Sequence, residues 1–264
     1  MSQAPHIVSL GCRLNTYEAD RMARLAQKAS TADDVVVINT CAVTGEAVRQ
    51  SRQAIRKARR ERPDAEIIVS GCAVQTDPGS FAEMPEISRL IGNGEKLSPA
   101  AYTAPTGVED VFAQTTLPRG PAAVGSLPVR THLEVQNGCD HRCTFCIIPF
   151  GRGQARSKTP ADCVAEALDL ARAGAREIVL TGVDLTSYGP DLGAGMTLAD
   201  PVTALLGALP KDITLRLSSI DGAEIDDRLF DLVTKAERIA PHLHLSLQSG
   251  DNMLLKRMKR RHSR

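Results

Sequence analysis

Short, continuously apolar runs alternate with longer helical patterns along this chain, and this alternation limits the possible folds more than any other feature. In the first hundred residues the apolar runs cover 7–10, 34–40, 65–70 and 88–92, and the helical patterns cover 17–29 and 46–62. An apolar run without polar alternation is typical of a parallel strand buried on both faces. We therefore expect an α/β fold, beginning with an open parallel sheet domain over residues 1–101.

The second half of the chain repeats the alternation after an irregular stretch. Residues 102–129 are rich in Pro, Gly, Thr and Ala and read as a linker, with one short helix expected at 108–113. Strands are expected at 131–136, 177–181, 213–218 and 242–247, and helices at 160–173, 197–209 and 226–236. Four strand–helix units predict a parallel barrel, or part of one, over residues 130–264. The basic run from Lys256 to Arg264 lies in what reads as the next helix, so we expect the barrel to be incomplete.

Composition places the chain among cytoplasmic globular proteins. Hydrophobic residues make up 42% of the 264 residues, charged residues 24%, and the net charge is +1. There is no basic, apolar leader at the N-terminus and no run of roughly 20 apolar residues, so neither a signal peptide nor a membrane span is expected. Seven cysteines without a secretory signal favour metal or redox chemistry over a disulfide framework.

Cys139, Cys143 and Cys146 form a C-x-x-x-C-x-x-C loop. Three thiolates from one short loop can hold three corners of a [4Fe–4S] cluster and leave the fourth iron open to a small molecule, whereas such clusters otherwise take four cysteines. A zinc site using these thiolates plus His141 is the first alternative, although zinc ligands usually come in two separated pairs. A redox pair of Cys143 and Cys146 is the second, but it leaves Cys139 unexplained.

Cys12, Cys41 and Cys72 each follow one of the first three expected strands. The loops at the carboxyl ends of parallel strands line a common crevice, so these cysteines are expected to converge there and to hold a second three-cysteine cluster. The plainer alternative is that they are buried as small hydrophobic side chains. Cys163 falls inside an expected helix, away from both sets, and is interpreted as structural.

With both sets of cysteines placed, the chain resembles the methylthiotransferases of the radical S-adenosylmethionine (SAM) superfamily. The resemblance is carried by Leu-Gly-Cys12, Val-Ile-Asn-Thr-Cys41, Val-Ser-Gly-Cys72 and Gly-Cys139-Asp-His-Arg-Cys143-Thr-Phe-Cys146, with Leu-Thr-Gly-Val-Asp-Leu-Thr-Ser-Tyr-Gly189, Arg-Leu-Ser-Ser219 and His-Leu-Ser-Leu-Gln-Ser-Gly250. It implies SAM and two [4Fe–4S] clusters as cofactors, one cluster on Cys139, Cys143 and Cys146 for SAM and an auxiliary one on Cys12, Cys41 and Cys72. It also implies that a 5′-deoxyadenosyl radical abstracts hydrogen from the substrate, and that a methylthio group is delivered from the auxiliary cluster.

The residues of these motifs most resemble those of the branch that methylthiolates N6-threonylcarbamoyladenosine next to the tRNA anticodon. Sister branches act on isopentenyladenosine in tRNA or on an aspartate of a ribosomal protein. The resemblance implies tRNA, a sulfur source and an electron donor such as a flavodoxin or ferredoxin as partners. Family members continue through a complete barrel and a small RNA-binding domain, which do not follow Arg264 here. A non-catalytic, metal-stabilised RNA-binding module is therefore the alternative of a different class.

Further residues are expected to line the SAM site because they lie in the cysteine loop or at the carboxyl ends of barrel strands. They are Phe145, Asp184, Ser218, Ser219 and Gln248. Packing of Phe145 on the barrel rim and a turn role for Asp184 remain open. Arg152 and Arg156 could bind phosphate or carboxylate bidentately, or could be solvated loop arginines.

The helical pattern over 49–62 carries seven basic residues and one acidic residue. A solvated face is the usual explanation of such a run. On an otherwise neutral protein, however, it also suits contact with an RNA backbone, which is sequence-blind and salt-sensitive. The candidate RNA-contacting residues are Arg49, Arg52, Arg56, Lys57, Arg59 and Arg60.

Overall fold

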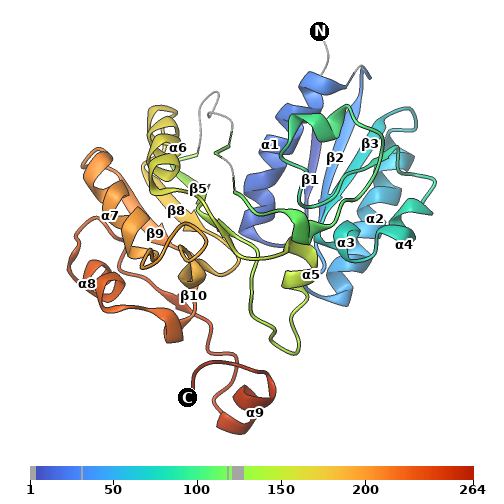
Figure 1. Cartoon of the computed structure of the whole chain (residues 1–264). Coiled ribbons are helices and arrows are strands. Elements are labelled where there is room, and N and C mark those ends of the chain that lie inside the picture. Colours follow the sequence, from blue (N-terminus) through green and yellow to red (C-terminus); the bar gives the residue numbers. More distant parts are fainter. Residues whose placement is uncertain (1–3, 31, 118, 121–127) are drawn as a thin grey trace. The chain divides into compact units, whose positions relative to one another are not determined.

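The computed structural model describes residues 4–30, 32–117, 119–120 and 128–264, and its contacts divide the chain into two units (Figure 1). Unit 1 comprises Met1–Gln114 and Ile147–Gln154, and unit 2 comprises Thr115–Cys146 and Ala155–Arg264. Residues 147–154 therefore fold with the N-terminal part of the chain. The domain boundaries at 101 and 130 stay predictions, and residues 118 and 121–127 of the expected linker lie outside the described part.

In unit 1 the apolar runs form one parallel sheet. Its order is β1 (His6–Ser9), β2 (Val35–Thr40), β3 (Glu66–Gly71) and β4 (Arg89–Leu90). Ser9 pairs with Asn39, and Asn39 pairs with Ser70, so the first three strands end at nearly the same level. This register brings whatever follows each strand to one edge of the sheet.

Helices cover both faces of this sheet. Val36 and Ile38 of β2 share a buried cluster with Ile55 of α2 (Gly45–Glu61). The alternate residues Val35 and Val37 share another with Met22 of α1 (Arg13–Ala29). All six residues of β2 are buried, as expected for a parallel strand covered on both sides.

Unit 1 also contains several shorter elements. They are α3 (Cys72–Thr76), α4 (Pro78–Ala82), the 3-10 turns η1 (Pro99–Tyr102) and η2 (Val111–Ala113), and α5 (Ile148–Arg152). The helix expected at 108–113 is thus only the single turn η2. Its start is fixed by Asp110, whose carboxylate accepts a hydrogen bond from Phe112 N.

Unit 2 contains a second parallel sheet. Its order is β5 (Arg130–Glu134), β8 (Glu177–Thr181) and β9 (Thr214–Leu217). Three helices, α6 (Pro160–Arg172), α7 (Ala199–Ala208) and α8 (Asp227–Lys235), pack on it through one hydrophobic cluster. The predicted α/β class with parallel sheets is confirmed.

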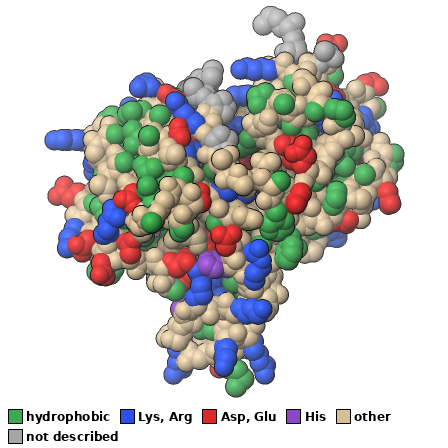
Figure 2. Space-filling view, in the orientation of Figure 1, with side chains coloured by type: hydrophobic (Ala, Val, Ile, Leu, Met, Phe, Trp, Pro, Cys, Tyr) green, Lys and Arg blue, Asp and Glu red, His purple; other side chains and the backbone are tan. Residues whose placement is uncertain are grey.

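The fourth expected strand of unit 2 is largely missing. The run 242–247 forms only β11 (His244–Leu245), which pairs with β10 (Ser219–Ile220) as a separate two-stranded sheet in the described residues. Both residues of β11 are exposed, because no described element covers this alternating His-Leu pattern. Past β11 the expected last helix is α9 (Asn252–Arg257), and Figure 2 shows Lys and Arg side chains gathered on this segment.

A small antiparallel pair frames the cysteine loop, and sequence analysis missed it. β6 (Gln136–Asn137) pairs with β7 (Arg156–Ser157). Two-residue strands carry too little periodicity to be found from sequence. In the described part of the chain, no helix combines the length and apolarity that crossing a membrane requires.

Candidate metal centres

Three cysteines lie at the carboxyl ends of adjacent strands in unit 1. Cys41 directly follows β2, Cys72 directly follows β3 as the first residue of α3, and Cys12 follows β1 as the N-cap of α1. Burial raises the pKa of the Cys41 thiol, and the sulfur atoms of Cys72 and Cys12 raise it further. The structure therefore brings the three thiols together, as the strand-end pattern predicted.

Two glycines make room for this arrangement. Gly11 and Gly71, directly before Cys12 and Cys72, have φ values of +96° and +106°. L-residues rarely adopt such angles. A Cβ added at Gly11 would lie 2.5 Å from Cys41 Sγ. The Gly-Cys pairs in the sequence are thus a requirement of the backbone at this edge.

Two asparagine side chains make hydrogen bonds at the same edge of the sheet. Asn15 Nδ2 donates to Leu10 O at 2.7 Å and to Thr40 O at 3.0 Å, which ties the ends of β1 and β2 together. Asn93 Nδ2 lies 3.6 Å from Cys72 Sγ. The cysteines are therefore presented by a hydrogen-bonded frame rather than by free loops.

The second set of cysteines lies in the loop of unit 2 between β6 and β7. Cys146 N donates to Cys143 O at 3.1 Å, so these two residues share a tight turn. Thr144 N donates to Met258 O at 3.2 Å, which attaches the loop to the end of α9. Cys139 is buried, whereas Cys143 and Cys146 are partly exposed and accessible to a ligand.

Polar groups surround Cys139. Burial raises the pKa of its thiol to about 12, helped by the charges of Asp184 and Cys146. Asp184 Oδ2 lies 3.4 Å from Cys139 Sγ and 3.0 Å from His141 Nε2. His141 Nε2 also lies 3.0 Å from Ser187 Oγ. Asp184 therefore lies beside Cys139 of the cysteine loop, and its role in binding SAM stays a prediction.

The spacing of the sulfur atoms tests which metal centre fits. Three thiolates on one zinc ion, at about 2.3 Å each, would lie about 3.8 Å apart. Within the described residues, only Cys139, His141 and Asp184 bring three candidate ligand atoms within 4.8 Å of one another, and neither cysteine set does so. In the described residues, neither set therefore has its three sulfur atoms at the spacing of a single-ion site. For the zinc alternative, the structure groups His141 with Cys139 and Asp184 rather than with all three loop cysteines.

The other predicted SAM-site residues differ in their surroundings. Phe145 is 53% exposed and Gln248 is exposed with φ +65°, so both are accessible. Ser218 is buried, and its Oγ has no hydrogen-bond partner in the described part of the chain. Ser219 Oγ lies 2.9 Å from His244 Nδ1 and holds β10 to β11.

Arg152 and Arg156 are not solvated loop residues, because they are only 2% and 5% exposed. Arg152 donates to Glu18 from Nη1 at 2.9 Å and from Nη2 at 3.1 Å. The phosphate-binding alternative does not apply to it, since an internal carboxylate takes the guanidinium. The sequence analysis did not identify Glu18. Its carboxylate lies on the same face of α1 as the buried Leu14 and Met22, and this spacing could have shown that it is buried.

Cys163 lies where the sequence analysis placed a structural cysteine. It is fully buried in α6, its Sγ lies 3.6 Å from Lys158 O, and burial raises the pKa of its thiol to about 12. A buried thiol of raised pKa is unreactive.

Comparison with known families matches the two halves of the chain separately. Residues 5–92 match the family described as "Uncharacterized protein family UPF0004". Residues 133–264, half of the chain, match the radical SAM superfamily. The chain belongs to the radical SAM superfamily. Members of this superfamily use SAM and [4Fe–4S] clusters.

Several relatives of this radical SAM protein are methylthiotransferases. The chain is 46% identical, over 98% of its length, to the threonylcarbamoyladenosine tRNA methylthiotransferase MtaB of Rickettsia prowazekii, and 33% identical, over 97%, to that of Bacillus subtilis. It is 32% identical, over 98%, to the ribosomal protein uS12 methylthiotransferase RimO of Desulfosudis oleivorans. It spans 60–62% of the length of these relatives.

A solved radical SAM structure has the same fold. The methyltransferase TsrM from Kitasatospora setae matches with a TM-score of 0.63 and 16% identity, covering 92% of this chain and 53% of TsrM. At this identity the likeness concerns the fold alone.

Proposed function

We propose that this chain carries the two metal centres of a radical SAM methylthiotransferase that converts N6-threonylcarbamoyladenosine in tRNA to its 2-methylthio derivative. The observation that carries the proposal is the presence of two separate three-cysteine sets, one after the first three strands of unit 1 and one in the loop between β6 and β7. The names of the MtaB relatives support the substrate. A low-potential electron donor and a sulfur source are required partners of this reaction.

Each of the two units would hold one of the two clusters. Cys139, Cys143 and Cys146 would hold the cluster that binds SAM, and Cys12, Cys41 and Cys72 would hold the auxiliary cluster. When bound, the cluster and SAM supply a one-electron cleavage that generates a 5′-deoxyadenosyl radical. Each set provides three protein ligands, which leaves one iron of a four-iron cluster open.

Side chains near the SAM loop orient that site. Asp184 accepts a hydrogen bond from Ser187 Oγ at 2.9 Å and faces His141, so the carboxylate is held in one place. The buried Ser218 Oγ offers a free donor and acceptor to a polar ligand. Fixed polar groups of this kind select and position a small ligand at a strand-end site.

Anaerobic reconstitution with iron and sulfide tests the chemistry. We expect about eight irons per chain, the sum of two four-iron clusters, and SAM cleavage after reduction. Zinc binding, or clusters that never cleave SAM, would instead support the alternative of a non-catalytic, metal-stabilised RNA-binding module.

The substrate is tested in cells that lack this protein. Mass spectrometry of tRNA nucleosides should show that the 2-methylthio derivative of N6-threonylcarbamoyladenosine is lost and its precursor accumulates. Loss of methylthiolated isopentenyladenosine would point to the sister tRNA branch. An unmethylthiolated uS12 aspartate would point to the RimO-like activity, which the relative from Desulfosudis oleivorans makes the first alternative.

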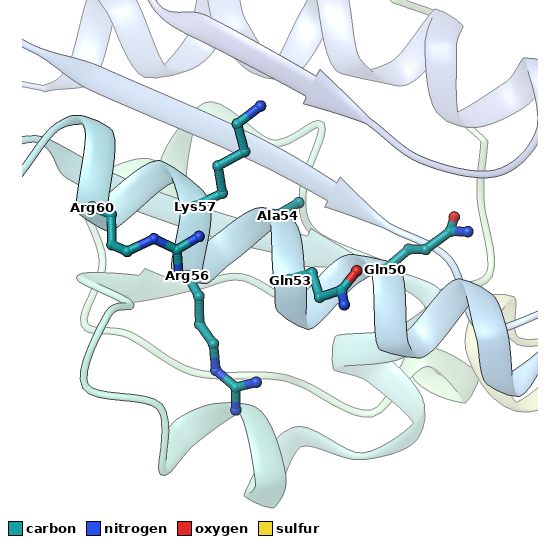
Figure 3. A pocket seen from close by; sticks show the side chains of 6 residues that line it. All are labelled: Gln50, Gln53, Ala54, Arg56, Lys57 and Arg60. Carbon is teal, nitrogen blue, oxygen red and sulfur yellow. The ribbon is translucent and has the colours of Figure 1, made fainter.

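A basic face on α2 supports contact with the tRNA backbone. Gln50, Gln53, Ala54, Arg56, Lys57 and Arg60 line a shallow, open depression on this helix (Figure 3). Arg56 and Lys57 are exposed, with only distant ion pairs at 3.8 Å to Glu86 and Glu61. Surface pairs of this kind contribute little, so these cations remain available to phosphates.

The other three candidate RNA-contacting residues make shorter or more numerous contacts within unit 1. Arg59 donates to Glu86 O, Pro63 O, Ala65 O and Ser88 Oγ and thereby stabilises the end of α2. Arg49 pairs with Glu46 at 2.6 Å, and Arg52 lies over the ring of Phe81. We therefore confine the proposed RNA-contacting set to Arg56, Lys57 and Arg60.

Neutralising these three residues should weaken tRNA binding in a salt-dependent way. Each lost phosphate contact lowers the slope of log K against log salt by about 0.7–0.9, so the variant R56Q/K57Q/R60Q should lose roughly two units of slope. Filter binding at several salt concentrations measures this. The control R172Q/K211Q/K235Q removes the same charge from exposed positions of unit 2. An equal loss in both variants would contradict a specific contact on α2.

A further inference from the structure

Three charged side chains are buried together in unit 1, beneath the edge that carries Cys12, Cys41 and Cys72. Glu18, Lys96 and Arg152 are 1%, 1% and 2% exposed. Glu18 Oε2 accepts from Lys96 Nζ at 2.5 Å, and Glu18 Oε1 accepts from Arg152 Nη1 at 2.9 Å. The carboxylate of Glu18 thus accepts hydrogen bonds from two basic side chains.

This triad combines two basic side chains with one carboxylate. Burial opposes ionisation of Glu18, yet Arg152 and Lys96 lower its pKa to about 2, so the carboxylate is ionised. Arg152 is permanently charged. Burial and the charge of Arg152 lower the pKa of Lys96, although Glu18 opposes this. The fixed cation of the triad is therefore Arg152.

The guanidinium of Arg152 lies close to the cysteines. Arg152 Nη2 donates at 2.7 Å to Asn15 Oδ1, and that same oxygen lies 3.7 Å from Cys12 Sγ. Burial disfavours the charged guanidinium, but the charges of Glu18, Cys72 and Cys12 raise the pKa of Arg152 well above its usual value. A single side chain, Asn15, therefore separates the guanidinium of Arg152 from Cys12.

The backbone beside Arg152 is in contact with the same edge. Gly151 O accepts from Asn93 Nδ2 at 2.5 Å, and a Cβ added at Gly151 would lie 3.1 Å from Cys72 Cβ. Arg152 is therefore held from two sides, through its guanidinium and through the preceding residue. Its distance to the cysteines is fixed by the fold.

We propose that Arg152, held by Glu18, is a positioning residue that compensates the negative charge of the cofactor bound by Cys12, Cys41 and Cys72. Three thiolates make an iron–sulfur cluster anionic, and reduction adds one electron without breaking a bond, so the cluster becomes more negative by one charge. A fixed cation stabilises the reduced form more than the oxidised form. This inference rests on the proposed auxiliary cluster. It adds that the charge of Arg152 helps to set the reduction potential of that cluster.

The test isolates that cluster in the full chain. The parent variant C139A/C143A/C146A lacks the SAM-cluster ligands and keeps those of unit 1. Its midpoint potential is measured by titration with dithionite as the electron source, followed by electron paramagnetic resonance. The compared variants are Arg152→Gln, which removes a positive charge, Glu18→Gln, which removes a negative charge, and Arg152→Lys, which keeps the charge.

Opposite shifts are the expected result. The potential should fall in R152Q, rise in E18Q and stay near the parent value in R152K. If the role of Arg152 is purely structural, all three variants should bind less iron, and the direction of any shift in midpoint potential should not depend on the charge that was removed. If R152Q loads no iron while R152K loads it normally, the charge is needed for assembly, which also supports the proposal.

Two results would overturn it. Equal or same-direction shifts in R152Q and E18Q would show that the triad does not act through its charge, as would equal loss of iron in R152Q and R152K. A parent variant that binds no iron on Cys12, Cys41 and Cys72 would overturn the proposed auxiliary cluster, and this inference with it.

Discussion

Replacing Cys143 with alanine is expected to abolish reductive SAM cleavage and to remove about four of roughly eight irons per chain. Two thiolates cannot hold three corners of a four-iron cluster. Cys143 is partly exposed, and its Sγ lies 3.9 Å from Arg260 Nη1. Iron analysis and quantification of 5′-deoxyadenosine after dithionite reduction measure the effect.

Two further variants make this prediction specific. Cys163→Ala removes a buried sulfur that belongs to neither set and should cost about 1 kcal/mol of stability without loss of iron. Cys41→Ala should lose the other four irons and all methylthiolation, yet still cleave SAM. Retention of full SAM cleavage by C143A would remove the basis for assigning the SAM cluster to this loop.

The position of the cysteines was predictable because each follows an apolar strand. Cys41 and Cys72 end continuous runs of buried residues, and parallel strands in register place such residues at one edge. The sequence alone therefore predicts the sheet of unit 1 and the convergence of its thiols. The same reasoning locates β8, whose observed bounds Glu177–Thr181 are those expected.

The charge network under the cysteines could not be predicted in the same way. Glu18 contacts Lys96 across 78 positions of the chain and Arg152 across 134 positions. Neither separation corresponds to a helical or strand period, so no local pattern links these residues. An arginine just past the cysteine loop looks like a solvated residue until α5 is found to fold into unit 1.

The extent of a partly exposed strand was also not predicted correctly from the hydrophobic pattern. The expected strand at 242–247 has the alternation of a half-buried strand, but burial depends on a neighbour that the sequence of the run does not specify. In the structure, the strand shrinks to His244 and Leu245, which pair with β10. Hydrophobic alternation predicts a strand's periodicity but not its pairing.

Replacing Gly71 with alanine is expected to destabilise unit 1 and to prevent loading of the auxiliary cluster. At φ +106° an L-residue is strained, and the added Cβ would lie 2.4 Å from Thr40 O and 2.5 Å from Thr40 N. Both atoms belong to the backbone of β2, so they cannot turn away as a flexible side chain would. Backbone strain and overpacking together should cost roughly 3 kcal/mol.

Gly45→Ala is the matched control in the same unit. Gly45 begins α2, its φ is not in the left-handed region, and nothing lies within 4 Å of an added Cβ. The free energy of unfolding in urea should change by less than about 1 kcal/mol there. G71A should unfold at lower urea and bind about half the iron, yet retain SAM cleavage, because Gly71 lies beside Cys72 and not in the SAM loop. Equal iron content and equal stability in G71A and G45A would contradict the close packing of β3 against Thr40, on which the spacing of the three thiols depends.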